Sequence, residues 1–112
     1  MARFQTTLTG DPQALVAHLD EAILGGSLTA DREEATAQRI GDAQMMVLVY
    51  ERFSAIGGNR VSLSVSILAV GRQLAVTMVG AGGSHALFFK VNNFSDGAFL
   101  TKGRRALESF VG

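Results

Sequence analysis

A glycine-rich segment, GAGGSH at residues 80–85, contains the residue types that most invite a chemical interpretation. A serine beside a histidine could supply a nucleophile and its base, and closely spaced glycines could expose backbone N–H groups to an anion. Ser84 and His85 are adjacent, however, and adjacent side chains of an extended chain point to opposite faces. They cannot readily hydrogen-bond to each other, so we assign no catalytic residue and leave open whether the protein is an enzyme.

The same glycines do not match the known phosphate-binding motifs. His85 stands where a dinucleotide fingerprint needs its third glycine, and the segment after it alternates like a strand where a helix is required. No lysine follows to meet a phosphate, and Ala86 replaces the second glycine of a nucleophile elbow. We therefore expect no cofactor.

Composition excludes several further classes of function. Ten basic residues balance ten acidic ones, so no overall field draws the chain to nucleic acid or to a membrane surface. There is no cysteine, and His18 and His85 lack a carboxylate at ligand spacing, so no metal site is expected. The first ten residues lack the apolar core of a signal peptide, which predicts a cytoplasmic protein. A length of 112 residues predicts a single domain over residues 1–112.

Alternating and helical patterns divide the chain into eight elements. The helices are predicted at 11–25, capped by Asp11 and ended by a left-handed Gly25, and at 95–111, capped by Ser95. Residues 45–50 are apolar on both sides, which predicts a central strand covered on both faces. Charges on residues 27–39 favour an edge strand. The predicted strands are 2–8, 27–39, 44–54, 60–70, 73–79 and 85–91.

Short connections between these strands predict an antiparallel meander. The fold class is α+β: five to six strands with two helices, one after the first strand and one C-terminal, packed on one face. A helix-grip-like arrangement, in which a curved sheet holds the C-terminal helix, is the nearest analogy. Turns are predicted at residues 41–42 and 71–72, at one end of the sheet.

Successive turns of a meander alternate between its two ends, which predicts where the remaining glycines gather. The glycine pairs 25–26, 57–58 and 82–83 should meet at the end opposite the turns at 41–42 and 71–72. Glycine in tight turns is the simpler explanation, whereas bare backbone could also admit a ligand. On the second interpretation, the candidate ligand-binding residues are Asn59, Arg60, Gly82, Gly83, Ser84 and His85.

Two of these segments, YERFSAIGGNRVSL and GGSHALFFKVN, carry a resemblance to a known family. The chain resembles, nearly end to end, a family of small bacterial proteins known only as a domain of unknown function. The resemblance implies no activity, substrate or catalytic residue.

Three functions remain open. The first is a non-enzymatic interaction module that self-associates through the second face or an edge of its sheet, because Met46 and Leu48 or their neighbours would need cover. The second is a carrier of a small apolar molecule, with a pocket between the last helix and the sheet. The third and least favoured is an enzyme with His85 as its general base.

Overall fold

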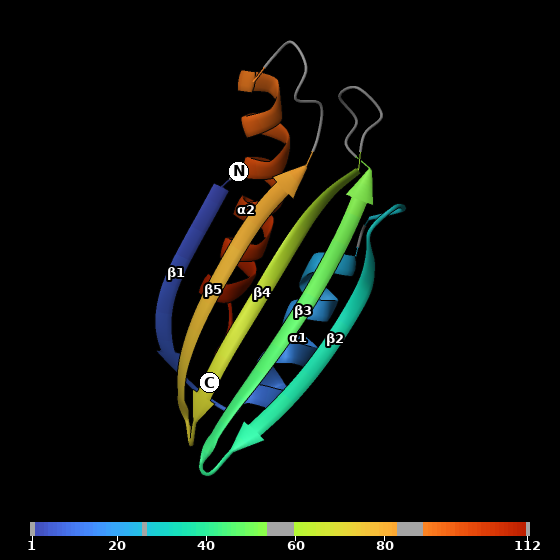
Figure 1. Cartoon of the computed structure of the whole chain (residues 1–112). Coiled ribbons are helices and arrows are strands. Elements are labelled where there is room, and N and C mark those ends of the chain that lie inside the picture. The colour runs from blue at the N-terminus through green and yellow to red at the C-terminus, as the bar shows by residue number, and fades with distance from the viewer. Residues whose placement is uncertain (1, 26, 54–59, 83–88, 112) are drawn as a thin grey trace.

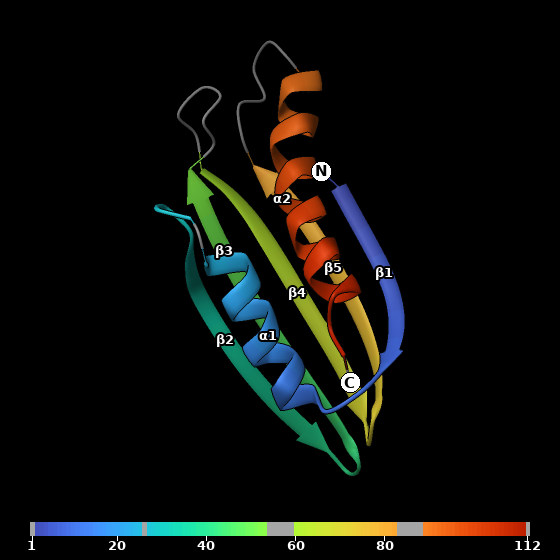
Figure 2. The ribbon, with the colours of Figure 1, turned by 180° about the vertical axis from the view of Figure 1, so that it is seen from behind.

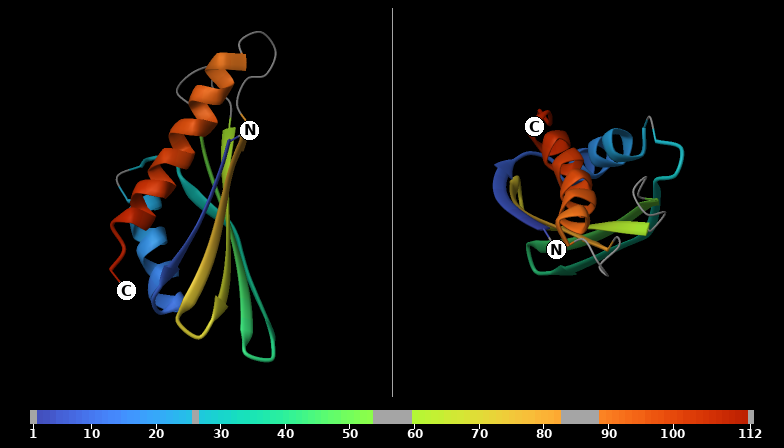
Figure 3. Two further views of the ribbon diagram at one scale, coloured as in Figure 1. Left: turned by 90° about the vertical axis from the view of Figure 1, so that its left-hand side faces the viewer. Right: turned by 90° about the horizontal axis from the view of Figure 1, so that it is seen from above.

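The structure, a computed structural model, describes residues 2–25, 27–53, 60–82 and 89–111, and of residues 89–97 the backbone alone. Five antiparallel strands form one sheet in the order β1-β5-β4-β3-β2, and two helices lie side by side on one face of it (Figures 1 and 2). Figure 3 shows these two layers from the side and from above. The elements are β1 (Ala2–Thr9), α1 (Pro12–Leu24), β2 (Asp31–Ile40), β3 (Ala43–Phe53), β4 (Arg60–Val70), β5 (Gln73–Gly82) and α2 (Phe89–Glu108).

Two tight hairpins connect β2 to β3 and β4 to β5, as predicted. The last pairs before each turn are Ile40 with Ala43 and Val70 with Gln73, which leaves two residues in each loop. Gly41 and Gly71 have φ values of 58° and 61°, in the left-handed region that favours glycine. We call this the hairpin end of the sheet, and the opposite end, where β3 and β5 finish, the glycine end.

Strand alternation separates a covered inner face from an open outer face. In β4, Val61, Leu63, Val65 and Ile67 are buried beneath the helices, whereas the serines between them are half-buried on the outer face. Helix α1 adds Leu15, Leu19 and Ile23, all fully buried, as its predicted stripe requires. The core therefore lies entirely between the inner face and the two helices.

The beginning of α1 forms as predicted, but its end does not. The Asp11 side chain accepts a hydrogen bond from the Ala14 N–H at 2.8 Å, and Pro12 occupies the first turn. Gly25 has an extended conformation, with φ −66° and ψ 138°, so the predicted left-handed exit is wrong. Glycine is still required, because a Cβ there would lie 2.5 Å from the Glu21 carbonyl oxygen.

The C-terminal helix begins earlier than predicted. Phe89 to Val91 were assigned to a strand over 85–91, but they form the first turn of α2, and Ser95 lies inside the helix rather than at its cap. A short apolar run fits a strand or a buried helix equally well, which is the physical reason for the error. The sheet thus has five strands, and α2 starts at the glycine end and runs toward the hairpin end (Figure 2).

The positions of two strands in the sheet test the predictions for them. β3 lies between β4 and β2, so it is an interior strand as predicted, but its predicted cover on both faces is wrong. Met46 and Leu48 are buried beneath the helices, while Met45 on the outer face remains 38% exposed, so β3 is covered on one face only. β2 is an edge strand as predicted, with all ten residues exposed and an irregularity between Arg32 and Glu34.

Candidate functional site

Gly82 is the last residue of β5, at the glycine end of the sheet. A close backbone contact explains why this residue is a glycine. It pairs with Val61, has a φ of 100°, and a Cβ on it would lie 2.8 Å from the Arg60 carbonyl oxygen. A side chain would meet both an unfavourable φ and the neighbouring backbone. The sheet itself therefore requires this glycine.

Arg60, the first residue of β4, lies in a small charged cluster on the outer face. Its Nε donates to Glu51 Oε1 at 2.9 Å, its Nη2 lies 4.0 Å from Glu33 Oε2, and its guanidinium stacks 5.0 Å from the Phe53 ring centroid. Glu51 and Phe53 thus share one face of β3, and the ion pair of Glu51 with Arg60 joins β3 to β4. With 45% of its side chain exposed, Arg60 can still contact other groups.

The other candidate ligand-binding residues, Asn59, Gly83, Ser84 and His85, lie outside the described residues. The strands that flank them are placed as the meander requires: Phe53 pairs with Arg60, and Val61 pairs with Gly82, at the glycine end. The structure thus locates Arg60 and Gly82 on adjacent strands at the predicted end of the sheet.

His18, on α1, joins the two helices. Its Nε2 lies 2.8 Å from the Ala106 carbonyl oxygen, which requires a proton on that nitrogen, and 2.9 Å from Ser109 Oγ. Its ring centroid is 5.5 Å from that of Phe110. Among the described residues, no three histidine or acidic side chains cluster in a way that could hold a metal ion.

A polar cluster that sequence reasoning missed connects α1 with β2 and β3. The Tyr50 hydroxyl donates to Asp20 Oδ1 at 2.6 Å, and Arg32 Nη1 donates to Asp20 Oδ2 at 2.5 Å. Burial of Tyr50, and then its hydrogen bond to Asp20, raise the pKa of the phenol, which therefore stays protonated. No local pattern could reveal this cluster, because its members come from three separate elements.

The most unusual surface is the outer face of the sheet in its half nearest the hairpins. The strand registers align its residues in three rows, each crossing all five strands. None of these fifteen residues is charged, although a share of 18% charged residues would place about three in such a set. We call this set the uncharged field. It comprises Thr9, Gln73, Val70, Ala43 and Ile40; Thr7, Ala75, Leu68, Met45 and Gln38; and Gln5, Thr77, Ser66, Val47 and Thr36.

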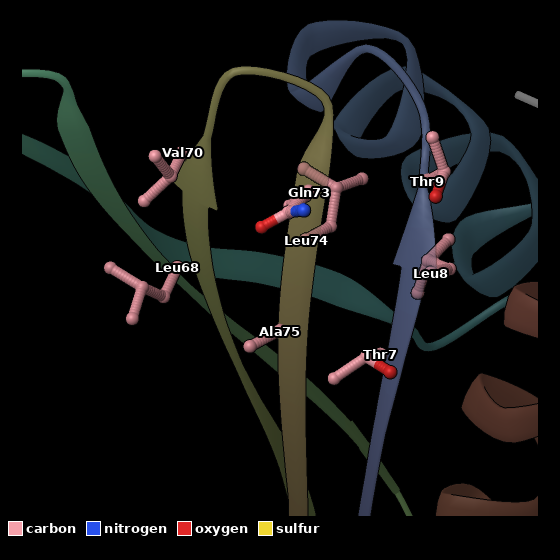
Figure 4. A pocket seen from close by; sticks show the side chains of 8 residues that line it. All are labelled: Thr7, Leu8, Thr9, Leu68, Val70, Gln73, Leu74 and Ala75. Atoms are coloured by element: carbon pink, nitrogen blue, oxygen red, sulfur yellow. The ribbon is translucent and has the colours of Figure 1, made fainter.

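Large apolar side chains in the uncharged field are open to solvent. Ile40 is 86% exposed, Val70 47% and Leu68 41%. A hollow of about 510 Å³ across β4, β5 and β1 is lined by six residues of the field together with Leu8 and Leu74, which pack in or against the core (Figure 4). Contiguous exposed apolar surface without charge is typical of a protein contact, because charged side chains are depleted at the centre of interfaces.

Charged groups surround the uncharged field only at its margins. The next row toward the glycine end contains Arg3 and Glu34 at its two edges, with Val49 and Val79 between them. Farther along lies the ion pair of Arg60 with Glu51. A charge-free centre with a charged margin is the arrangement of a protein interface.

The fold and this surface define a small α+β protein whose helices cover one face of its sheet and leave the other open. The chain belongs to the family of unknown function DUF6054, whose model matches residues 1–111. This confirms the resemblance to an uncharacterised domain. No curated protein matches the chain. Among the described residues, no helix is both long enough and apolar enough to cross a membrane.

Proposed function

We propose that the protein is a non-enzymatic interaction module that forms a homodimer by packing the uncharged fields of two copies against each other. The observation that carries the proposal is the absence of charge over three complete rows of an exposed sheet face. An uncharged face meets its own copy without like-charge repulsion, and a two-fold axis gives both copies the same contact.

The dimensions of the uncharged field suit such a contact. Four strand spacings of about 4.8 Å and two row spacings of about 6.8 Å give a field of about 19 by 14 Å between its outermost Cα atoms. A standard interface buries about 800 Å² on each partner, so the contact would extend over the adjoining row with Val49 and Val79. Small hydroxyl and alanine side chains let two sheets approach to about 10 Å.

The carrier function, with a pocket between α2 and the sheet, has less support. A pocket between α2 and the sheet would need space near Gly103, yet a Cβ there would lie 2.8 Å from Leu63 Cδ2 and 3.0 Å from Met78 Sδ. Helix and sheet are therefore in direct contact at Gly103. The small-molecule carrier and the enzyme with His85 as its general base stay predictions from the sequence. A bacterial, cytoplasmic setting is likewise the expectation that the resemblance and the sequence give.

Substitution of Leu68 by lysine tests the proposal. Leu68→Lys places two charges at the centre of the contact, and we expect the dimer to dissociate at least tenfold more readily, since unpaired buried charge costs more than 1.4 kcal/mol. Light scattering after size exclusion measures this. The matched control is Leu28→Lys, because Leu28 is fully exposed outside the field. A monomeric wild-type protein at millimolar concentration, or equal effects of both substitutions, would contradict the proposal.

A further inference from the structure

A groove between α1 and α2, on the side of the molecule away from the outer face, has an unusual polar lining. It has a volume of about 340 Å³ and lies between Ala22 of α1 and one face of α2. That face contributes Thr101, Lys102, Arg105 and Ser109. Two cations, two hydroxyl groups and three alanines line the groove, and none of its lining residues is acidic.

A second arginine stands close to this groove. The Arg52 guanidinium, from the end of β3, lies 4.4 Å from the centroid of the Phe99 ring of α2. Burial, and then the nearby charge of Arg52, lower the pKa of Lys102, and burial lowers the pKa of Arg52. Arg52 therefore adds positive charge near Lys102, which follows Phe99 by three residues on α2.

Neither of these cations has an acidic partner in the part of the chain that the structure describes. Other arginines do: Arg32 pairs with Asp20 at 2.5 Å, Arg60 with Glu51 at 2.9 Å, and Arg104 with Glu108 at 3.5 Å. Two like charges brought together without a carboxylate repel each other and destabilise the free protein. A bound anion would remove this repulsion.

We infer that this groove binds a small oxyanion of the phosphate or carboxylate class. Lys102 supplies a point charge and Arg105 a fork of N–H donors, while Arg52 adds positive potential nearby. The volume lies at the lower end of the range of about 300–1,000 Å³ that ligand pockets occupy. The groove and the uncharged field are on opposite sides, so the two sites are independent of each other.

The experiment is an NMR titration with inorganic phosphate and with citrate, each against sodium chloride of equal ionic strength. We expect saturable shifts of the amides of Thr101, Lys102, Arg105 and Ser109 with at least one of the two anions. Stronger binding of phosphate assigns the phosphate class, and stronger binding of citrate the carboxylate class. No saturation beyond the chloride effect with either anion would overturn the inference.

Two variants separate a specific site from general attraction. Lys102→Gln should weaken binding about tenfold, the loss of one charge-assisted contact. Arg104→Gln is the matched control, because Arg104 stands on the same helix but stacks 4.6 Å from the ring centroid of Phe4 and pairs with Glu108. Equal weakening by both would overturn the inference.

Thermal unfolding measured without added anion distinguishes a lost binding site from a folding defect. In dilute chloride, Lys102→Gln should raise the midpoint of thermal unfolding, since it removes the repulsion from Arg52. Anion should raise the midpoint of the wild-type protein more than that of Lys102→Gln. A lower midpoint for Lys102→Gln without anion would show that Lys102 is already compensated within the protein, and would overturn the inference.

Discussion

The two faces of the sheet carry different kinds of side chain, although both arise from the same alternation along the strands. On the inner face, Leu63, Val65 and Met78 are fully buried beneath the helices. On the outer face, threonine, serine, glutamine, alanine and a few large apolar residues form three rows without charge. The inner face is recognisable by its hydrophobicity, whereas the outer face is unusual for what it lacks. Missing charge, not apolar content, is the feature of the outer face on which the proposed contact rests.

The largest expected effect comes from truncating the inner face. Leu63→Ala should lower the free energy of unfolding by about 2–5 kcal/mol, because it removes a fully buried side chain beneath α2. The neighbouring outer-face change, Ser64→Ala, should change it by no more than about 0.5 kcal/mol. Urea unfolding at one fixed protein concentration measures both. If both substitutions lowered the free energy of unfolding by similar amounts, the two faces would not differ in their contribution to stability.

A larger side chain at Gly103 tests how closely α2 packs on the inner face of the sheet. Gly103→Val should cost about 1–3 kcal/mol of stability, since its Cβ would lie 2.8 Å from Leu63 Cδ2. Ala98→Val, at an exposed position of the same helix, should cost about 0.5 kcal/mol through helix propensity alone. Thermal unfolding compares them, and a tolerated Gly103→Val would mean that the helix packs less closely.

Removal of the Tyr50 hydroxyl tests the polar link on the inner face. Tyr50→Phe should lower the free energy of unfolding by about 1 kcal/mol, because Asp20 loses one hydrogen bond but keeps Arg32. Denaturant unfolding measures the loss. The control is the double variant Tyr50→Phe/Asp20→Asn. Its loss in free energy of unfolding should differ from the sum of the two single losses, and an additive loss would contradict the direct contact.

The smallest effect is a pH dependence in the helix layer. The pKa of Lys102 is lowered in the folded protein, so the unfolded chain binds more protons between that pKa and 10.5. Stability should therefore rise in the wild-type protein relative to Lys102→Gln as the pH increases toward 10.5. Thermal unfolding at pH 7 and pH 10 measures the difference between the two proteins. A difference that does not change with pH would show that Lys102 titrates normally.

Local patterns in the sequence were sufficient for much of the fold. Alternation gave the faces of β1 and β4, Gly41 and Gly71 marked the hairpins, and Asp11 marked the start of α1. The start of α2 could not be derived, because apolar spacing in a short segment fits both a strand and a helix.

The candidate sites depend on long-range pairing. The sequence predicted a sheet face as the contact, through Met46 and Leu48 or their neighbours, because it could not fix which side of β3 the helices cover. Met46 and Leu48 are buried, and the neighbouring Met45 is the exposed one. The uncharged field appears only after five strands are aligned in register. The Arg52–Lys102 pair likewise joins residues far apart along the chain, and spacing could not reveal it.

The most direct test is NMR with a soluble paramagnetic gadolinium chelate, recorded at increasing protein concentration. The account predicts that the methyl groups of Met45, Leu68 and Val70 become protected from the chelate as concentration rises, while those of Val16 and Leu28 do not change. Protection confined to Ala35 and Ala37 of the β2 edge, or no protection at any concentration, would contradict a contact through the outer face.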